Sequence, residues 1–582
     1  MQGTRQVPQA LLSGVLSASL AAMLVAAPLT GVQRAQANPA STTGTIIITA
    51  QSFNEGVTYD AWQIFTGTTI EGTREVTADD GTTTTETVKR IEDVQWASSA
   101  MRTTVVQVIQ AHYDGDESSY TDPTDASTSA QRAAEFIAEH IGDEDGTASG
   151  TFPGSSDVIQ AESGTFAMDL ALAVSALDAT TTIMPGVATT LANGWWLVAT
   201  DSSSLTDQGS TGTSPLLVTI GASDVEITEK VTTAPEPVKR AYEDSTKAWA
   251  YAVDTNCYQV TDYRIDVALP DNWKSYATYY LKFTDTFVNG FILNDVGTYS
   301  VSYVDEDGAE EDVSDYFSFK WSSSQDTITA TCTDVLKFYD NGGTITLYYQ
   351  AYITEEAVTG AEGNSNGVTV TYSNNPLHPG QESTSTYEPP EVTTYTYQIT
   401  IHKQDKQDPS RSLAGAKFTL QVASGNSDAA SVGKYVQADG SLADEVYKFE
   451  SDEDGDIVIP RIDEGTYTLT ETDVPDAIDD SVYRAISPTT IVITTNIEEV
   501  GEDVTGGTAL TLDAVSSDGE VIVTDMDADS GVIAITVTDA KQTLLPKTGS
   551  TIALMLLAAG LAMLAAGAAR AASRRRKADA VL

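Results

Sequence analysis

The sequence has 582 residues, with 83 acidic side chains against 31 lysines and arginines, and its formal net charge at pH 7 is −52. This charge excludes nucleic acid as a partner, because the phosphates would repel the chain, and it is typical of a highly soluble protein. The two cysteines allow at most one disulfide bond, which cannot stabilise a chain of this length. At about 150 residues per domain, the length predicts three or four domains.

The first 37 residues have the features of a secretory signal peptide. Arg5 precedes an apolar run from 11 to 27, and Ala35-Gln36-Ala37 is a small-x-small cleavage site. A first transmembrane helix is the alternative, but Ser and Gly interrupt the run. We therefore expect the mature chain to begin near Asn38, outside the cell.

The body of the chain is rich in Thr, Ser, Asp, Gly and Tyr and has few long helical patterns, which predicts β-sandwich modules. The first module, 42–226, combines strand-like and helical patterns and is expected to be α+β. Its expected strands are "GTIIITA", "TYDAWQIFTG", "GWWLVATDSSS" and "SPLLVTI", and its expected helices lie around 93–113, 129–141 and 165–178.

"APEP" at 234–237 marks a boundary, and a second module is expected over 236–390. Its alternating segments are "YRIDVALPD", "YYLKFTDTFVNGF", "DTITATC", "GTITLYYQAYI" and "NGVTVTYSNNP". The polar, proline-containing "HPGQESTSTYEPPE" then predicts a linker. The third module, 394–541, has its clearest strands in "YTYQITIHKQD", "GAKFTLQV", "GTYTLTETDVP" and "VIAITVTDAKQ".

Three strands of the third module carry an apolar stripe that runs into an ionisable residue on the same face: Lys403, Glu471 and Asp539. Burying an isolated charge is very costly. One alternative is that each stripe ends at a strand tip, where the polar group reaches water. The other is chemical, because a desolvated lysine has a lowered pKa and becomes a neutral nucleophile.

A desolvated glutamic acid stays protonated and can hydrogen-bond an acceptor carboxamide or carboxyl group while shuttling protons. The amine then attacks, and an amide bond joins two side chains. Water leaves if the acceptor is aspartic acid, and ammonia leaves if it is asparagine.

"ITIHKQD", "SLAGAKFTL", "GTYTLTETDVP" and the last strand before residue 545 resemble the collagen-adhesin B-type domain of Gram-positive pilins. The resemblance covers the whole third module. It implies Lys403 as the nucleophile, Glu471 as the catalytic acid and Asp539 as the acceptor. Those pilins usually have asparagine at the last position, where this chain has Asp539.

The second module has a similar pattern, in which apolar stripes share a face with Asn374 and with Asp285. "YSNNP" and "FTDT" resemble the middle domain of backbone pilins. The resemblance implies an isopeptide bond between Lys239 and Asn374, assisted by Asp285. Strand parity favours Asn374 over Asn375, and the alternative for Asn374 is a turn residue before Pro376.

Backbone pilins also carry a lysine between their first two modules, in a motif ending V-x-V-Y-P-K. "GASDVEITEK" occupies that place and ends at Lys230, which strand parity turns outward. The resemblance implies Lys230 as the intersubunit lysine. Gly221 replaces the usual tryptophan and Thr228-Glu229 replaces Tyr-Pro, so an exposed lysine without this role remains the alternative.

Cys257 and Cys332 both fall in the second module, where a disulfide bond and two buried thiols remain open, because geometry cannot be read from sequence. The four histidines have no metal-ligand spacing. We therefore expect no metal site and no cofactor.

The C-terminal end contains Leu545, Pro546, Lys547, Thr548 and Gly549, followed by an uncharged segment, 552–569, and a basic tail, 570–582. The segment is about long enough to be a transmembrane segment, and the tail would mark its cytoplasmic end. A permanent single-pass anchor is one alternative. The three features in this order resemble the LPxTG signal of proteins that sortase cuts between Thr and Gly and attaches to the Gram-positive cell wall.

Together these features are similar to a major (backbone) pilin of a sortase-assembled Gram-positive pilus. The expected fold is mainly β, with tandem immunoglobulin-like β-sandwich domains after an α+β N-terminal domain. The expected partners are pilin-type and housekeeping sortases, copies of the chain itself, minor pilins, peptidoglycan and a host or bacterial surface ligand. We expect no enzymatic turnover beyond self-crosslinking. A monomeric wall-anchored adhesin and a basal or minor pilin are the alternatives.

Overall fold

The computed structural model describes residues 42–51, 55–77, 83–113, 119–141, 158–205, 210–221, 224–228, 234–288, 290–294, 299–339, 342–378, 380–381, 383–425, 428–475, 482–498, 509–542 and 550–578. The expected signal peptide (1–37), Lys230 and the sorting signal 545–549 lie outside the described residues.

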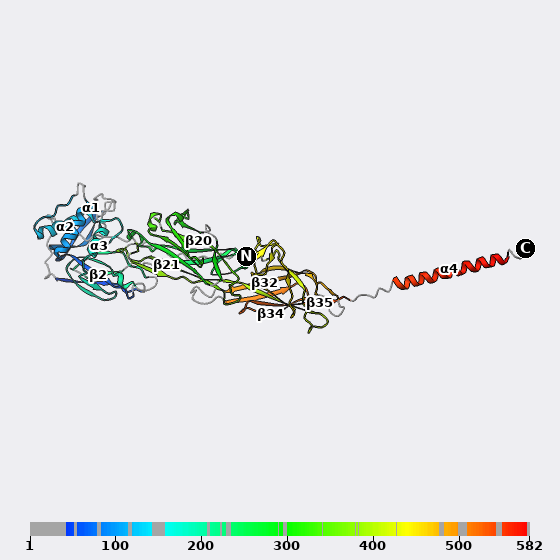
Figure 1. The fold of residues 1–582 in the computed structure, drawn as a ribbon. Helices are drawn as coiled ribbons and strands as arrows, with labels where there is room; N and C mark the ends of the chain where they lie inside the picture. Colours follow the sequence, from blue (N-terminus) through cyan, green and yellow to red (C-terminus); the bar gives the residue numbers. More distant parts are fainter. Residues whose placement is uncertain are drawn as a thin grey trace. The chain divides into compact units, whose positions relative to one another are not determined.

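Residue contacts divide the chain into two compact units. The first two modules belong to one unit, which extends to Tyr395, and the third module belongs to the other. Strands dominate both, as the sequence predicts, and helices α1, α2 and α3 gather beside strand β2 in the first module (Figure 1).

In its described residues, the first module combines two sheets with three helices. A three-stranded sheet has the order β6-β1-β9, and a six-stranded sheet has the order β3-β2-β7-β8-β4 with β5 paired to β2. The elements are β1 (Thr43–Ile48), β2 (Tyr59–Thr77), β3 (Thr83–Trp96), α1 (Ser99–His112), α2 (Ala126–His140), β4 (Val158–Gln160), α3 (Phe166–Ser175), β5 (Thr181–Ile183), β6 (Thr189–Ala192), β7 (Gly194–Thr200), β8 (Leu216–Ile220) and β9 (Val225–Ile227).

Strand β7 is buried along its whole length because apolar side chains cover both of its faces. Trp195 and Leu197 pack with residues of the helices, and Trp196 and Val198 pack with residues of the smaller sheet. This explains why "GWWLV" lacks the alternation of a half-exposed strand.

The three helices begin at side-chain caps. Ser98, Asp125 and Thr165 each accept a hydrogen bond from a backbone N–H in the first turn. The helices predicted around 129–141 and 165–178 correspond to α2 and α3. The first predicted helix begins too early, because 93–96 belong to β3, the second strand of a long hairpin with β2.

The second module is a sandwich of two sheets, with a hydrophobic core between them. Their orders are β11-β10-β13-β20-β16-β17, with β15 on β20, and β12-β23-β21-β14-β19-β18, with β22 on β21. The strands are β10 (Val238–Glu243), β11 (Ala248–Ala250), β12 (Ala252–Asp254), β13 (Thr261–Val267), β14 (Leu281–Phe287), β15 (Phe291–Leu293), β16 (Ser300–Val304), β17 (Glu310–Asp312), β18 (Ser318–Trp321), β19 (Thr327–Cys332), β20 (Thr344–Ile353), β21 (Asn364–Ser373), β22 (Thr384–Tyr387) and β23 (Val392–Tyr395).

The predicted linker after the second module is wrong in part. Strand β22 lies inside "HPGQESTSTYEPPE" and pairs with β21, and β23 pairs with both β12 and β21. Two prolines between β22 and β23 gave the segment the appearance of a linker. The sheets of the second module therefore continue to Tyr395, beyond the expected end at 390.

The third module is also built from two sheets, in the orders β29-β24-β35-β31, with β34 on β35, and β27-β26-β25-β30-β32-β33, with β28 on β25. Its first and last strands, β24 and β35, are parallel neighbours. The strands are β24 (Tyr397–Asp405), β25 (Lys417–Val422), β26 (Tyr435–Val436), β27 (Leu442–Ala443), β28 (Phe449–Glu450), β29 (Asp456–Ile462), β30 (Gly465–Asp473), β31 (Tyr483–Arg484), β32 (Thr489–Glu498), β33 (Ala509–Ser516), β34 (Val521–Asp527) and β35 (Val532–Lys541).

The two cysteines of the second module are both buried thiols that are not joined in a disulfide bond. Cys332 ends β19 opposite Leu281, and Cys257 lies near the backbone oxygen of Ile353. The disulfide bond left open by the sequence is therefore wrong, and the alternative of two buried thiols is correct.

Helix α4 (Ser550–Ala578) contains the predicted transmembrane segment 552–569. Among the residues that the structure describes, no helix is both long enough and apolar enough to cross a membrane.

Candidate self-crosslinking sites

The third module brings Lys403, Glu471 and Asp539 together in its core. The Lys403 ammonium lies 3.0 Å from Glu471 Oε1 and contacts Asp539 Oδ1 directly. All three side chains are fully buried. The strand-tip alternative for these residues is therefore wrong.

The positions of the three groups follow from strand alternation. Every second residue of β24 is buried, ending with Lys403 and Asp405, and β35 alternates in the same way up to Asp539. Lys403 pairs with Val537 in the parallel ladder, so Asp539 is the next inward residue on the neighbouring strand. Glu471 comes from β30 of the opposite sheet.

The carboxyl groups of this site favour a shared proton. Burial raises the pKa of Glu471 to about 7; the nearby Lys403 opposes this and Asp539 adds to it. Burial also raises the pKa of Asp539, again opposed by Lys403. The backbone N–H of Ile486 donates to Glu471 Oε2 at 2.9 Å and holds this carboxyl group in place. Near neutral pH, Glu471 can therefore both donate and accept a proton.

The second module contains a matching site formed by Lys239, Asp285 and Asn366. Lys239 Nζ donates hydrogen bonds to Asp285 Oδ2 at 2.8 Å and to Asn366 Oδ1 at 2.6 Å. All three residues are fully buried. Lys239 lies on β10 of one sheet, whereas Asp285 and Asn366 lie on the neighbouring strands β14 and β21 of the other. The contact therefore crosses the sandwich.

Burial shifts the pKa values of Lys239 and Asp285 in the directions that favour the neutral amine and the neutral carboxylic acid. It lowers the pKa of Lys239 to about 8, although Asp285 acts in the opposite direction. It also raises the pKa of Asp285, opposed by Lys239. Transfer of one proton from the ammonium to the carboxylate removes two buried charges and produces a neutral amine beside a carboxamide.

The predicted acceptor Asn374 is wrong, because the structure places Asn366 against Lys239. Asn374 follows the end of β21, eight positions along the same face, which corresponds to about 26 Å at ~3.3 Å per residue. Its carboxamide donates to Ser385 Oγ and accepts from Ser383 Oγ.

Sequence reasoning missed Asn366 because the apolar stripe of β21 has an asparagine at each end. Asn366, Val368 and Val370 are alternate buried residues of β21, and Asn374, which has the same parity, is also buried. The deciding information is the pairing register: Asp285 lies opposite Val368, and its neighbour on the same face, Phe287, lies opposite Asn366. Register depends on the partner strand, which the stripe alone does not specify.

The segment around Asn374 instead connects the first two modules within their common unit. The backbone N–H of Gly212 donates to the Asn374 carbonyl, and Asn375 Nδ2 donates to the Thr200 carbonyl at 3.0 Å. Leu377 packs into the helical core of the first module. Asn374 is thus buried by a contact between modules.

A third lysine–carboxylate pair lies beside the third-module site, but its lysine is more exposed to solvent. Lys541 Nζ is 2.8 Å from Asp405 Oδ2, and the Tyr483 hydroxyl donates to the same oxygen at 2.9 Å. About a third of the Lys541 side chain is exposed, and its hydrogen bond with Asp405 raises the pKa of its ammonium. This lysine stays charged and is a poor nucleophile.

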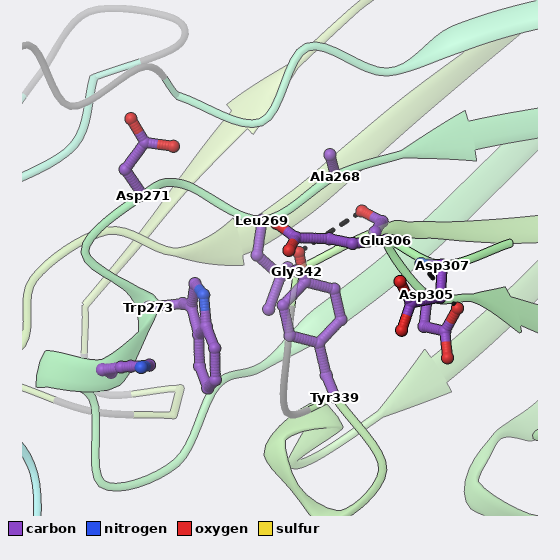
Figure 2. A pocket seen from close by; sticks show the side chains of 11 residues that line it. Ala268, Leu269, Asp271, Trp273, Asp305, Glu306, Asp307, Tyr339 and Gly342 are labelled. Atoms are coloured by element: carbon purple, nitrogen blue, oxygen red, sulfur yellow. Dashed lines mark hydrogen bonds between the residues drawn. The ribbon is translucent and has the colours of Figure 1, made fainter. Parts of the chain in front are cut away.

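A surface cavity of about 720 Å³ opens elsewhere on the second module. Figure 2 shows Trp273 and Tyr339 on its wall, with the carboxylates of Asp305, Glu306 and Asp307 nearby. None of the crosslinking residues lines it. Among the described residues, no group of three or more His, Cys, Asp or Glu side chains is arranged to hold a metal ion.

Comparison with known families identifies two segments. Residues 397–500 match the SpaA family, described as a prealbumin-like fold domain, and residues 538–579 match the LPXTG cell wall anchor motif. The chain is therefore a cell wall-anchored surface protein of a Gram-positive bacterium, and its third module contains a prealbumin-like domain.

Several solved structures are similar to this chain at low identity. The pilus 2b backbone protein of group B streptococcus is 21% identical, covering 53% of this chain and 99% of its own, with a TM-score of 0.35. The backbone pilin of Streptococcus pyogenes is 13% identical, with coverages of 86% and 99% and a TM-score of 0.47. The major pilin SpaD of Corynebacterium diphtheriae is 14% identical, with coverages of 88% and 100% and a TM-score of 0.42. No curated protein matches the sequence significantly.

Proposed function

We propose that this protein is the shaft subunit of a covalent cell-surface fibre. We also propose that it forms an amide crosslink within each of its second and third modules. The observation that carries the proposal is the buried contact of Lys403 with Glu471 and Asp539. An unreacted ion cluster of this kind is costly to bury, whereas an amide bond is neutral. The prealbumin-like domain and the wall anchor motif support the same conclusion.

The third-module reaction forms one bond between Lys403 Nζ and Asp539 Cγ. Lys403 becomes neutral by giving a proton to the carboxyl pair and then attacks the protonated Asp539 carboxyl group. Glu471 hydrogen-bonds the carbonyl oxygen, takes a second proton from Nζ and transfers a proton to the departing hydroxyl. The products are an amide and water. The reaction runs once per chain, so the protein is not an enzyme in the sense of turnover.

The second-module reaction joins Lys239 to Asn366, with Asp285 in the role of Glu471. Here the leaving group is ammonia. The site has the same three parts: a buried lysine, a buried acid and a carbonyl group within hydrogen-bonding distance of Nζ.

The position of the third-module bond would let it carry load in a fibre under tension. Lys403 lies on the first strand of the third module and Asp539 on the last. A pulling force that enters β24 and leaves through β35 would pass through a covalent bond, whereas a ladder hydrogen bond contributes only about 1 kcal/mol net. The bond therefore protects the module from being unzipped.

Intact mass of the reduced ectodomain, residues 38–544, tests the crosslinks. We expect a deficit of about 35 Da, since ammonia accounts for about 17 Da and water for about 18 Da. Glu471→Ala should restore about 18 Da and Asp285→Ala about 17 Da. A wild-type mass equal to that of the sequence would exclude both reactions.

Polymerisation requires an intersubunit bond, for which we propose Thr548 of one subunit and Lys230 of the next, formed by a pilin-type sortase. Boiling cell-wall extracts in SDS tests this directly. A ladder of high-mass species that disappears in Lys230→Arg supports the shaft role. A ladder that persists in the variant would exclude Lys230, and a single wild-type band would indicate the monomeric adhesin.

A further inference from the structure

A tyrosine hydroxyl touches the leaving group of the second-module site. Asn366 Nδ2 donates a hydrogen bond to the Tyr349 hydroxyl at 2.9 Å, while Asn366 Oδ1 accepts from Lys239. The two ends of the carboxamide are therefore held by different partners. Tyr349 fixes which end faces the nucleophile.

Tyr349 belongs to the same sheet as Lys239 but lies two strands away, on β20. Its ring is buried, and Lys239 Nζ lies 5.9 Å from the ring centroid. The hydroxyl is close enough to Asp285 to lower the pKa of that carboxyl group. Asp285 Oδ1, a buried oxygen, has no hydrogen bond in the described part of the chain. Tyr349 thus contacts the leaving nitrogen directly and lies close to Asp285, the acid that would resupply its proton.

We propose that Tyr349 is a catalytic residue of the second-module crosslink, whose hydroxyl orients the Asn366 carboxamide and passes the proton that converts the departing Nδ2 into ammonia. This inference rests on the self-crosslinking function proposed above. It adds a fourth participant to the lysine, the acid and the acceptor of the proposed reaction.

The proton balance closes with this relay. Lys239 passes one proton to Asp285 and attacks Asn366 Cγ as a neutral amine. As the Cγ–Nδ2 bond breaks, the Tyr349 hydroxyl gives its proton to Nδ2 and recovers one from Asp285, which takes another from Nζ. Of the three protons on the original ammonium, one stays on the new amide, one stays on Asp285 and one leaves with ammonia.

The need for a relay follows from the geometry of the amide. Lys239 lies at the oxygen end of the carboxamide, and the nitrogen that must be protonated donates a hydrogen bond to Tyr349 at the other end. An amide anion is a very poor leaving group, so a proton must arrive as the bond breaks. Tyr349 is the group in contact with that nitrogen.

Tyr263 offers a matched control. Its ring stacks on that of Tyr349 with centroids 5.3 Å apart, and it is equally buried. Its hydroxyl bonds to Thr394 Oγ1 at 3.0 Å and not to Asn366. Tyr263→Phe and Tyr349→Phe therefore remove the same atom from the same aromatic stack.

The experiment releases the denatured full ectodomain into folding buffer, quenches samples in acid and follows the loss of about 17 Da by intact mass. We expect Tyr349→Phe to slow the second-module reaction on the order of 10²-fold, the usual contribution of one proton-transfer group, and Tyr263→Phe to leave the rate nearly unchanged. Equal rates in Tyr349→Phe and wild type would overturn the inference. An absence of mass loss in wild type would instead overturn the proposed function.

Folding without crosslinking separates catalysis from packing. In an Asp285→Ala background the second-module bond cannot form, so Tyr349→Phe should leave the rate of folding nearly unchanged there. Folding slowed in this background as much as crosslinking is slowed in the parent would show that Tyr349 only packs the core, and would overturn the inference.

Discussion

Asp405 and Asp539 lie directly opposite each other on the parallel strands β24 and β35, and both are buried. Each contacts a lysine: Asp539 contacts Lys403 in a closed core, and Asp405 contacts Lys541 at the edge of the solvent. Proximity alone therefore does not distinguish a crosslinking pair from an ion pair. Burial of the lysine distinguishes them, because a fully buried ion pair is costly and its conversion to a neutral amide removes that cost, whereas a partly exposed lysine keeps contact with water.

The first prediction follows from this pair. We expect Lys541→Ala to keep the full mass deficit of the ectodomain and Lys403→Ala to lose about 18 Da of it. Intact mass of both variants checks the outcome. A deficit that shrinks in Lys541→Ala would mean that the exposed lysine is the one that reacts.

The second prediction concerns the acceptor in the second module. Asn366→Ala removes the carbonyl that Lys239 contacts, so we expect about 17 Da of the deficit to disappear. Asn374→Ala should keep the deficit, because Asn374 contacts Ser383 and Ser385 instead. Mapping the crosslinked peptides after digestion provides an independent check. A Lys239 peptide joined to Asn374 would refute the assignment.

The third prediction is a pH dependence of crosslinking in the third module. The pKa of Glu471 is raised to about 7, so this group is protonated below that pH and loses its proton above it. We expect the rate of the 18-Da loss to fall by up to about tenfold per pH unit above 7. Folding the denatured ectodomain at a series of pH values and quenching in acid measures this rate. A rate that keeps rising through pH 9 would argue that Glu471 acts only as an anion.

The fourth prediction concerns stability. Lys403 and Asp539 are 136 positions apart, so their bond would close a long loop of the unfolded chain. By the chain-entropy estimate for such loops, losing the bond costs about 5 kcal/mol. Glu471→Gln should therefore lower the unfolding midpoint of the third module. Asp473→Asn, on the same strand but exposed, is the control and should leave that midpoint nearly unchanged.

The fifth prediction concerns the cysteines. Because Cys257 and Cys332 are separate buried thiols, reducing agent should change neither the electrophoretic mobility nor the unfolding midpoint of the ectodomain. Titration of the denatured protein with a thiol reagent should count two free thiols. Fewer than two would indicate a disulfide bond that the structure does not contain.

Much of the third-module site could be predicted from sequence, because each of its strands alternates regularly and its apolar stripes run into Lys403, Glu471 and Asp539. Alternation determines which face of a strand a residue occupies. Because each of these strands has one buried face, alternation alone predicts that the three side chains are buried. The second module shows where this information ends. Asn366 lies in β21 and Asn374, with the same parity, lies just after its end, and only the pairing of β21 with β14 determines which of them reaches Lys239.

Two other features escaped sequence reasoning because they depend on distant partners. The end of strand β3, residues 93–96, looked like the start of a helix, since its partner β2 is needed to complete the hairpin. Strand β22 looked like a linker, since its polar residues form a ladder only on the edge of β21. Tyr349 carried no local signal, because its role depends on a contact with Asn366 from the other sheet.

The insertion of Leu377 into the helical core of the first module has a consequence for the order of folding. The helices and strands that form this core all lie before residue 221, but its last side chain comes from the segment that follows β21. A chain that emerges N-terminus first cannot close this core until most of the second module has followed it. A chain ending before Leu377 should therefore expose its first module to protease much faster than the complete ectodomain does, and equal cleavage rates would show that the first module folds without waiting.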